Sequence, residues 1–244
     1  MDISVAVQVD RPIARRPAEG TRFAAVDLGT NNCRLLVAEL HDDFSRIVRL
    51  GEGLAHSGRL GEAAMARTLA ALKVCARIID RNHVAAVRCV ATEACRRAVN
   101  GTAFIGRIAR VTGLDFEVLP HDEEARHAML GGVPLGDEDA DPLLMLDIGG
   151  GSTEILWLDR HDPTDGTAPG KALSLPVGVV TLSESSARGR AADAYAAMVE
   201  TVVRLLEPVG RDWPDLMGVR GGRLQMLGTS GTVTTLAALH LGLR

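Results

Sequence analysis

Two short segments of the sequence each combine a carboxylate with a turn of small residues. The first is Asp27-Leu28-Gly29-Thr30-Asn31, and the second is Asp147-Ile148-Gly149-Gly150-Gly151-Ser152-Thr153-Glu154. Glycine lets backbone N–H groups approach an anion closely, and hydroxyl and amide side chains add donors. The carboxylates cannot bind phosphate directly, but they can hold Mg²⁺, which bridges to phosphate oxygens. Either motif alone is typical of a plain hairpin, whereas the matched pair predicts two phosphate-binding loops.

A third glycine motif, Gly228-Thr229-Ser230-Gly231-Thr232, stands between an apolar run and an expected helix. The N-terminus of a helix together with hydroxyl groups can bind an anion. The alternative is an N-cap with no ligand. No Gly-Lys-Ser/Thr follows and the spacing is too short for a G-x-S-x-G elbow, so the motif is neither a Walker A loop nor a nucleophile elbow.

Two further segments carry charged groups that could act on a phosphate. Glu124 lies in the acidic start of an expected helix, where it could serve as a general base or simply stabilise the helix dipole. Its Glu-x-x-His spacing to His127 has no second copy in the chain, which excludes a di-metal carboxylate site. Arg96 and Arg97 directly follow an apolar run, so they could clamp a phosphate or lie on the surface.

The elements that must position these groups follow from apolar runs and their spacing. We expect strands at 23–26, 35–38, 46–50, 84–91, 116–119, 143–148, 153–158, 172–175 and 224–227. We expect helices at 61–81, 92–100, 103–111, 121–130, 190–207 and 232–241, and a polar loop at 159–170. The first three runs predict an antiparallel meander, and strand–Asp–x–Gly–turn–strand recurs at Asp147 as a weak duplication. The sequence therefore predicts an α/β protein of two similar lobes with a cleft between them.

The domain boundaries follow from composition along the chain. Residues 1–22 contain Pro12, Pro17 and Gly20 among scattered charges, so we expect a flexible tail. The best internal boundary is the stretch Gly131-Gly132-Val133-Pro134 with the acidic run 137–141 behind it. We therefore expect lobes at 23–134 and 135–244.

The composition excludes several classes of protein. With 46% hydrophobic and 24% charged residues over 244 positions, the chain is not wholly disordered, and no apolar run is long enough to span a membrane. A net charge of −4 and 3% aromatic residues argue against duplex binding and base stacking. The four cysteines form no C-x-x-C pair, and no apolar run follows Arg15 and Arg16, so we expect no Sec or twin-Arg signal. We expect a reduced, cytoplasmic protein with no duplex nucleic-acid or membrane partner; a homodimer stays open.

Together these segments resemble the exopolyphosphatase/guanosine pentaphosphate phosphohydrolase (Ppx/GppA) family, which is built on the actin-like fold. The matching stretches occur in the family's order and comprise 24–31, 91–101, 124–126, 146–154, 175–178 and 228–232. The block that ends in Ser152-Thr153-Glu154 is the most specific, and Glu124-Ala125-Arg126 separates this family from kinases of the same fold. The resemblance implies two actin-like (ribonuclease H-like) lobes, the second of them incomplete at its C-terminal end.

The resemblance also implies a reaction, namely hydrolysis of terminal phosphoanhydride bonds of inorganic polyphosphate or guanosine pentaphosphate with Mg²⁺. Residue by residue, it makes Glu124 the base that activates water, Asp147 and Glu154 the groups that hold Mg²⁺ or position that water, and Arg96 a phosphate ligand that offsets developing charge. The implied phosphate-binding set is Asp27, Gly29, Thr30, Asn31, Gly149, Gly150, Gly151, Ser152, Thr153, Gly228, Thr229, Ser230 and Gly231. Phosphoryl transfer depends mainly on positioning and electrostatics, so these roles need no covalent nucleophile.

Three short stretches depart from the family's usual pattern. Asn32-Cys33 replaces a common serine and apolar residue, and Thr181 stands where arginine is common, which bears on substrate preference. Glu123 precedes Glu124 where a Ser-Gly pair is common, so Glu123 stays open as an alternative base. Two other functions also stay open: an ATP-dependent kinase of the same fold, and a catalytically weak sensor that binds polyphosphate or a nucleotide.

Overall fold

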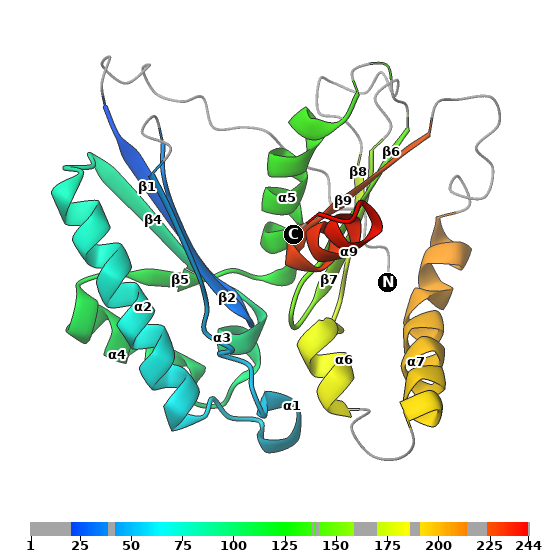
Figure 1. The fold of residues 1–244 in the computed structure, drawn as a ribbon, viewed down its shortest axis with the longest axis horizontal. Coiled ribbons are helices and arrows are strands. Elements are labelled where there is room, and N and C mark those ends of the chain that lie inside the picture. The colour runs from blue at the N-terminus through cyan, green and yellow to red at the C-terminus, as the bar shows by residue number, and fades with distance from the viewer. Residues whose placement is uncertain are drawn as a thin grey trace. The chain divides into compact units, whose positions relative to one another are not determined.

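The computed structural model describes residues 21–38, 42–137, 139, 142–158, 170–185, 191–213 and 224–243. These form two compact units, an N-terminal unit that runs to His121 and a C-terminal unit that starts at Asp122. The N-terminal unit contains β1 (Phe23–Leu28), β2 (Asn32–Val37), β3 (Asp42–Ile47), α1 (Leu54–Ser57), α2 (Glu62–Arg81), β4 (Ala86–Ala91), α3 (Glu93–Arg97), α4 (Gly101–Thr112) and β5 (Phe116–Val118) (Figure 1). The C-terminal unit contains α5 (His121–Gly132), η1 (Val133–Leu135), β6 (Leu143–Ile148), β7 (Thr153–Leu158), β8 (Gly170–Leu175), α6 (Val179–Ser185), α7 (Ala191–Asp212), β9 (Gln225–Thr229) and α9 (Ser230–His240).

The N-terminal unit is built on a sheet with the strand order β3-β2-β1-β4-β5. β1 pairs with β2 in antiparallel and with β4 in parallel register. Burial alternates along β1, so that Val26 and Leu28 enter the core while Asp27 is exposed on the other side. α2 and α4 cover the apolar face, where Leu72 and Phe104 belong to one hydrophobic cluster (Figure 1).

The C-terminal unit has a sheet with the order β8-β7-β6-β9 and apolar residues on both faces. On one face α5 contributes Ala125 and Met129 to the cluster around Met145. On the other face α7 contributes Val209 to the cluster around Trp157. Because both faces are buried, β7 reads as an almost continuous apolar run rather than an alternating one.

The two sheets repeat the same topology. β6, β7, β8 and β9 stand in the order of β1, β2, β3 and β4, and the turn after the first strand closes in the same way in both units. The Gly29 N–H donates to the Asn32 carbonyl at 2.9 Å, and the Gly149 N–H donates to the Ser152 carbonyl at 3.0 Å. The predicted α/β class, the meander and the internal duplication are therefore confirmed.

Several elements differ from the sequence-based expectation. The third strand lies at Asp42–Ile47 rather than 46–50, and α6 was not expected at all. α9 begins at Ser230 directly after β9, without the turn expected at 228–231. The predicted lobe boundary near Pro134 falls inside the C-terminal unit, because Ala125 and Met129 bind α5 to the second sheet. Of the tail predicted at 1–22 and the loop predicted at 159–170, residues 1–20 and 159–169 lie outside the described residues.

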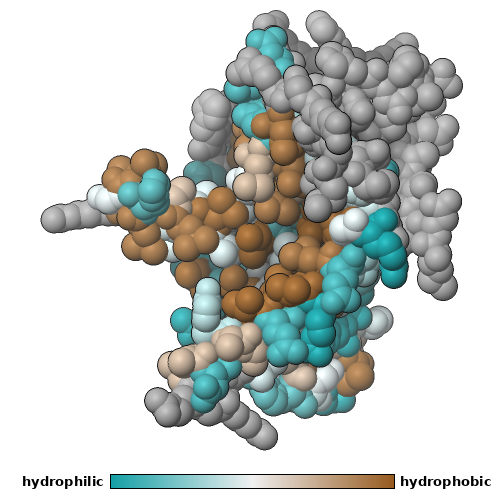
Figure 2. All heavy atoms as spheres, turned by 90° about the vertical axis from the view of Figure 1, so that its right-hand side faces the viewer, coloured by the Kyte–Doolittle hydropathy of each residue, from teal (hydrophilic) through white to brown (hydrophobic). Residues whose placement is uncertain are grey.

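The C-terminal unit exposes many large apolar side chains. They lie on α7 and on the segment from β9 to residue 243, and Figure 2 shows apolar side chains gathered on this side of the chain. They include Tyr195, Val199, Val203, Leu206, Met226, Leu236, Leu239, Leu241 and Leu243. No helix in the described ranges is both long and apolar enough to cross a membrane. All four cysteines are free thiols buried in the N-terminal unit.

Candidate functional site

A row of polar side chains crosses the sheet of the C-terminal unit. Asp147 on β6 pairs with Glu154 on β7, Glu154 pairs with Ser174 on β8, and Asp147 pairs with Thr229 on β9. Directly opposite residues on neighbouring strands project to the same face, so these side chains are lateral neighbours. The Ser174 hydroxyl donates to Glu154 Oε1 at 2.8 Å. The sequence predicts Asp147 and Glu154, but it gives no sign that Ser174 joins them.

Glu154 is a buried carboxyl surrounded by other acids. Only 3% of the residue is exposed, and its burial is the main reason why its pKa rises to about 7. Glu124 on α5 raises this pKa further by charge repulsion, and Asp147 adds a smaller effect of the same sign. Hydrogen bonds from Ser174 and Ser152 act in the opposite direction. Glu124, and not Glu123, is the acid of α5 that acts on Glu154.

The start of α6 holds the glycine loop at 149–151 through backbone hydrogen bonds. The N–H groups of Val179 and Val180 donate to the carbonyls of Gly149 and Gly150 at 3.1 and 2.9 Å. Gly178 is required here, because a Cβ at this position would lie 2.5–2.6 Å from backbone atoms of the same two glycines. Among the described residues, no hydrogen bond engages the N–H of Gly150 or Gly151. The loop therefore keeps two donors for an anion.

Thr181, which stands where arginine is common in the family, has a local structural role. Its residue is buried, and its hydroxyl accepts from the Gly178 N–H at 2.9 Å and lies 3.1 Å from the Gly178 carbonyl. The side chain thus fixes the turn that holds the glycine loop.

The third motif is fastened to the end of β6. The Thr232 hydroxyl donates to the Ile148 carbonyl at 2.8 Å, which ties the first turn of α9 to the residue before the glycine loop. Ser230 has a φ of 77°, in the left-handed region that a non-glycine residue rarely adopts. A Cβ at Gly228 would lie 2.6 Å from Val233 Cγ1, so only glycine lets the strand and helix meet this closely. Thr229 lies beside Asp147 in the sheet, and Ser230 follows it at the start of α9.

The first motif forms the corresponding loop of the N-terminal unit. Thr30 is 5% exposed, and the carbonyls of Thr30 and Asn31 accept from the backbone of a following loop at 48–51. Among the described residues, no hydrogen bond engages the N–H of Thr30 or Asn31. The two motifs therefore match in their free donors as well as in their residue types.

Arg96 is held by a buried acid at the end of β4. Its Nη2 lies 2.8 Å from Glu93 Oε2, and its Nη1 donates to the Leu119 carbonyl. Glu93 is 5% exposed and also lies 3.7 Å from the Nε2 of His121. Glu93 carries no sequence signal of its own, since acidic residues are common in the first turn of a helix.

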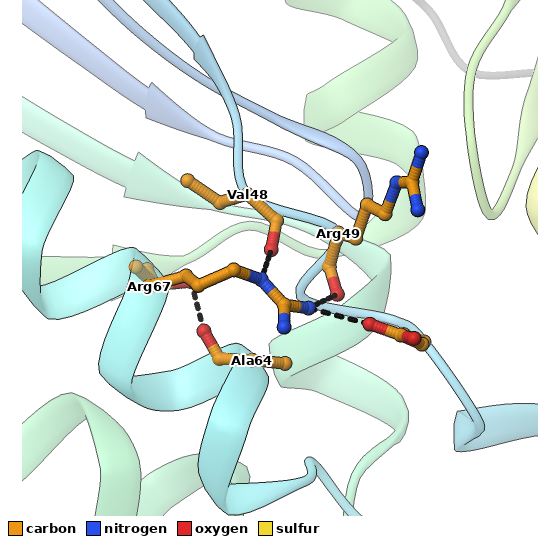
Figure 3. A network of polar contacts seen from close by, with 6 residues as sticks. Val48, Arg49, Ala64 and Arg67 are labelled. Carbon is orange, nitrogen blue, oxygen red and sulfur yellow. Dashed lines mark hydrogen bonds and ion pairs between the residues drawn. The ribbon is translucent and has the colours of Figure 1, made fainter.

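A further arginine, Arg67 on α2, braces the loop that follows β3 (Figure 3). Its Nε donates to the Val48 carbonyl at 3.0 Å, and its Nη2 reaches the Arg49 carbonyl at 3.5 Å and Glu52 Oε2 at 2.5 Å. The same loop donates to Thr30 and Asn31, so Arg67 supports the first motif through it. The sequence alone does not single out Arg67.

The structure thus gathers the predicted residues into two sets, one in each unit. Asp27, the loop at 29–31 and Arg96 belong to the N-terminal unit, and all the others belong to the C-terminal unit. The described residues contain no group of three or more His, Cys, Asp or Glu side chains arranged as a metal site. Asp147 and Glu154 form a pair, which suits an ion that keeps water ligands and binds one or two carboxylates, as Mg²⁺ does. On the same helix as Glu124, the Nδ1 of His127 bonds the Glu123 carbonyl at 2.7 Å.

Comparison with known proteins agrees with this arrangement. The sequence profile of the Ppx/GppA phosphatase family matches residues 39–242. Exopolyphosphatase 2 of Mycobacterium tuberculosis is 37% identical over 240 residues, which cover 90% of this chain and 70% of that protein. A guanosine-5'-triphosphate,3'-diphosphate pyrophosphatase of Photobacterium profundum is 31% identical over 228 residues, which cover 90% of this chain and 44% of that protein.

Solved structures give the same result for the fold. The crystal structure of an exopolyphosphatase-like protein superposes with a TM-score of 0.80 at 29% identity, covering 91% of this chain and 70% of that one. The match covers 91% of this chain, so the predicted α/β fold is confirmed, and the named relatives are phosphohydrolases. The chain belongs to the Ppx/GppA phosphatase family.

Proposed function

We propose that this chain hydrolyses the terminal phosphoanhydride bond of inorganic polyphosphate, using Glu124 as the base that activates water. The observation that carries the proposal is the row Asp147–Glu154–Ser174 with Glu124 next to it, beside a glycine loop that keeps free N–H groups. Family membership and the 37% identity to an exopolyphosphatase support the substrate class.

Glu154 and Glu124 have different roles because their surroundings differ. Glu154 is about half protonated near pH 7 when no cation is bound, since its pKa is about 7. Glu124 is only half-buried, so it can reach a water molecule and take its proton as that water attacks the terminal phosphorus. The proton passes to the Glu124 carboxylate, and the bridging oxygen leaves with the remaining chain.

Asp147 and Glu154 are the residues that would hold Mg²⁺. Ser174 and Ser152 both hydrogen-bond the Glu154 carboxylate, whose two oxygens offer about four lone-pair sites, so acceptor sites remain for a cation. When bound, Mg²⁺ would neutralise negative charge on the phosphate oxygens. The N–H groups of Gly150 and Gly151 would bind phosphate oxygens in the C-terminal unit, and those of Thr30 and Asn31, with Arg96, would do so in the N-terminal unit.

Guanosine pentaphosphate is the second candidate substrate, supported by the 31% identity to a guanosine pentaphosphate pyrophosphatase. Both candidates end in a phosphoanhydride and present a polyanion, so the same residues would act on either. Family membership favours hydrolysis over transfer to a sugar or small acid by a kinase of this fold. A weak sensor would bind these polyanions without turnover.

The test is phosphate release with Mg²⁺ from long-chain polyphosphate and from guanosine pentaphosphate, measured side by side. We expect phosphate release from polyphosphate. The substrate that is hydrolysed faster shows whether the chain is an exopolyphosphatase or a guanosine pentaphosphate phosphohydrolase. A parallel reaction with ATP and a panel of sugars and small acids tests the kinase. Binding of both polyanions without any release would overturn the hydrolase in favour of a sensor.

A further inference from the structure

The loop after β3 holds one arginine in an unusual backbone conformation. Arg49 has a φ of 49°, in the left-handed region that costs energy for a residue with a side chain. Outside glycine, the described residues adopt such angles only at Arg49, His83 and Ser230. His83 follows the end of α2, where the left-handed conformation is common, but Arg49 ends no helix. Its conformation is imposed by the surrounding bonds.

Those bonds fasten the loop to the first glycine motif. The N–H groups of Val48 and Arg49 both donate to the Asn31 carbonyl, at 2.8 and 3.0 Å, and the Gly51 N–H donates to the Thr30 carbonyl at 2.9 Å. The approach is close, because a Cβ at Gly51 would lie 2.3 Å from Thr30 Cγ2. The backbone of Arg49 is therefore fixed directly beside the two residues whose N–H groups stay free.

A second arginine holds the same loop from the side of α2. Arg67 bonds the carbonyls of Val48 and Arg49 and pairs with Glu52, so its charge is already engaged (Figure 3). The side chain of Arg49 runs away from Arg67 in this view. Its residue is exposed, and no hydrogen bond or ion pair engages its guanidinium among the described residues. The loop thus presents a cation that has a rigid base and no partner within the described chain.

We propose that Arg49 binds a phosphate group of the substrate next to the loop at Gly29–Asn31. A guanidinium offers paired N–H donors that match two phosphate oxygens, and a fixed backbone lowers the entropy lost when the side chain binds. This inference rests on the proposed function, since it assigns a binding residue for that polyanion. Arg49 binds a phosphate that is not transferred, so its loss should change KM rather than kcat.

The experiment compares Arg49→Ala and Arg49→Gly with Arg77→Ala in the whole chain. Arg77 is an exposed residue of α2. Arg77→Ala therefore removes one positive charge from the same unit and leaves the loop after β3 unchanged. We expect Arg49→Ala to raise KM for long-chain polyphosphate about ten-fold with kcat within about two-fold, as for loss of one charge-assisted contact made equally in the ground and transition states. Arg77→Ala should leave both constants unchanged.

Arg49→Gly separates binding from folding. Glycine adopts the left-handed region without strain, so this variant should unfold no more easily than wild type and still show the raised KM. A wild-type KM in both Arg49 variants, or the same increase in Arg77→Ala, overturns the inference. Direct titration of polyphosphate into Glu124→Gln and Glu124→Gln/Arg49→Ala isolates binding from turnover. If wild type releases no phosphate, the proposed function fails. Even then, a ten-fold lower affinity for polyphosphate in Glu124→Gln/Arg49→Ala than in Glu124→Gln still supports Arg49 as a phosphate ligand.

Discussion

Glu154 is the residue whose chemistry depends most on its surroundings. Burial and repulsion from Glu124 raise its pKa from an ordinary 4.5 to about 7, so the folded chain binds a proton here that the unfolded chain has already lost. Between these pH values stability must fall as pH rises, because the folded state carries more protons. The acid is therefore kept at a cost in folding free energy, which fits a functional role better than a structural one.

Replacing Glu154 by Gln should remove this pH dependence. Without a cation, Glu154→Gln should match wild type below about pH 4.5 and exceed its free energy of unfolding by up to about 3 kcal/mol above pH 7. Urea unfolding from pH 5 to pH 8 in the presence of a chelator measures the difference. Ser174→Ala should extend the pH range in which stability falls to higher pH, because the serine hydrogen bond stabilises the ionised form of Glu154. A difference that stays constant across this range would contradict the assignment.

At the scale of elements, α6 fixes the glycine loop of the C-terminal unit. Its first N–H groups hold the carbonyls of Gly149 and Gly150, and Gly178 makes room for that contact. The loop thus has its shape set by an element that follows two strands later in the chain.

Gly178→Ala should disrupt this contact. The added Cβ would lie within 2.6 Å of backbone atoms that no side-chain movement can relieve, so we expect a loss of about 1–3 kcal/mol in unfolding free energy and weaker phosphate binding. Gly210→Ala is the matched control, because it lies in α7 with no atom within 4 Å of the new Cβ. That variant should be more stable by roughly 0.5–1 kcal/mol. Equal stability of the two variants, measured by chemical denaturation, would show that α6 does not clamp the loop.

Much of this arrangement is predictable from the sequence. Asp27 and Asp147 each end an apolar strand and precede small residues, and both are found at such turns. The unpredicted parts depend on partners distant in the chain. α6 is too short to show a helical period, and Ser174 joins Glu154 only through strand pairing. Arg67 and Glu93 look like ordinary surface charges until the loop and Arg96 are in place.

At the scale of the whole molecule, the exposed apolar residues of α7 and α9 stand out. Leu236 and Leu239 on α9 are 59% and 72% exposed, and Tyr195 on α7 is 67% exposed. Patches of this kind favour association with other apolar surfaces.

We expect the purified chain to bind a hydrophobic dye or to self-associate. Leu236→Gln/Leu239→Gln should lower the dye signal and the apparent mass, with little change in unfolding free energy because neither side chain is buried. Dye fluorescence and light scattering over a concentration series provide the measurement. A monodisperse monomer that binds no dye would refute this expectation.

The central claim is that water attacks the terminal phosphate with Glu124 as its base, and the most direct measurement is phosphate release from long-chain polyphosphate by Glu124→Gln and Glu123→Gln. Both changes remove one charge from the same turn of α5, but only Glu124 acts on Glu154. We predict that Glu124→Gln lowers kcat by about 10²–10⁴-fold, the usual contribution of a general base, and that Glu123→Gln stays near wild type. Full activity in Glu124→Gln, or a loss confined to Glu123→Gln, would contradict the account.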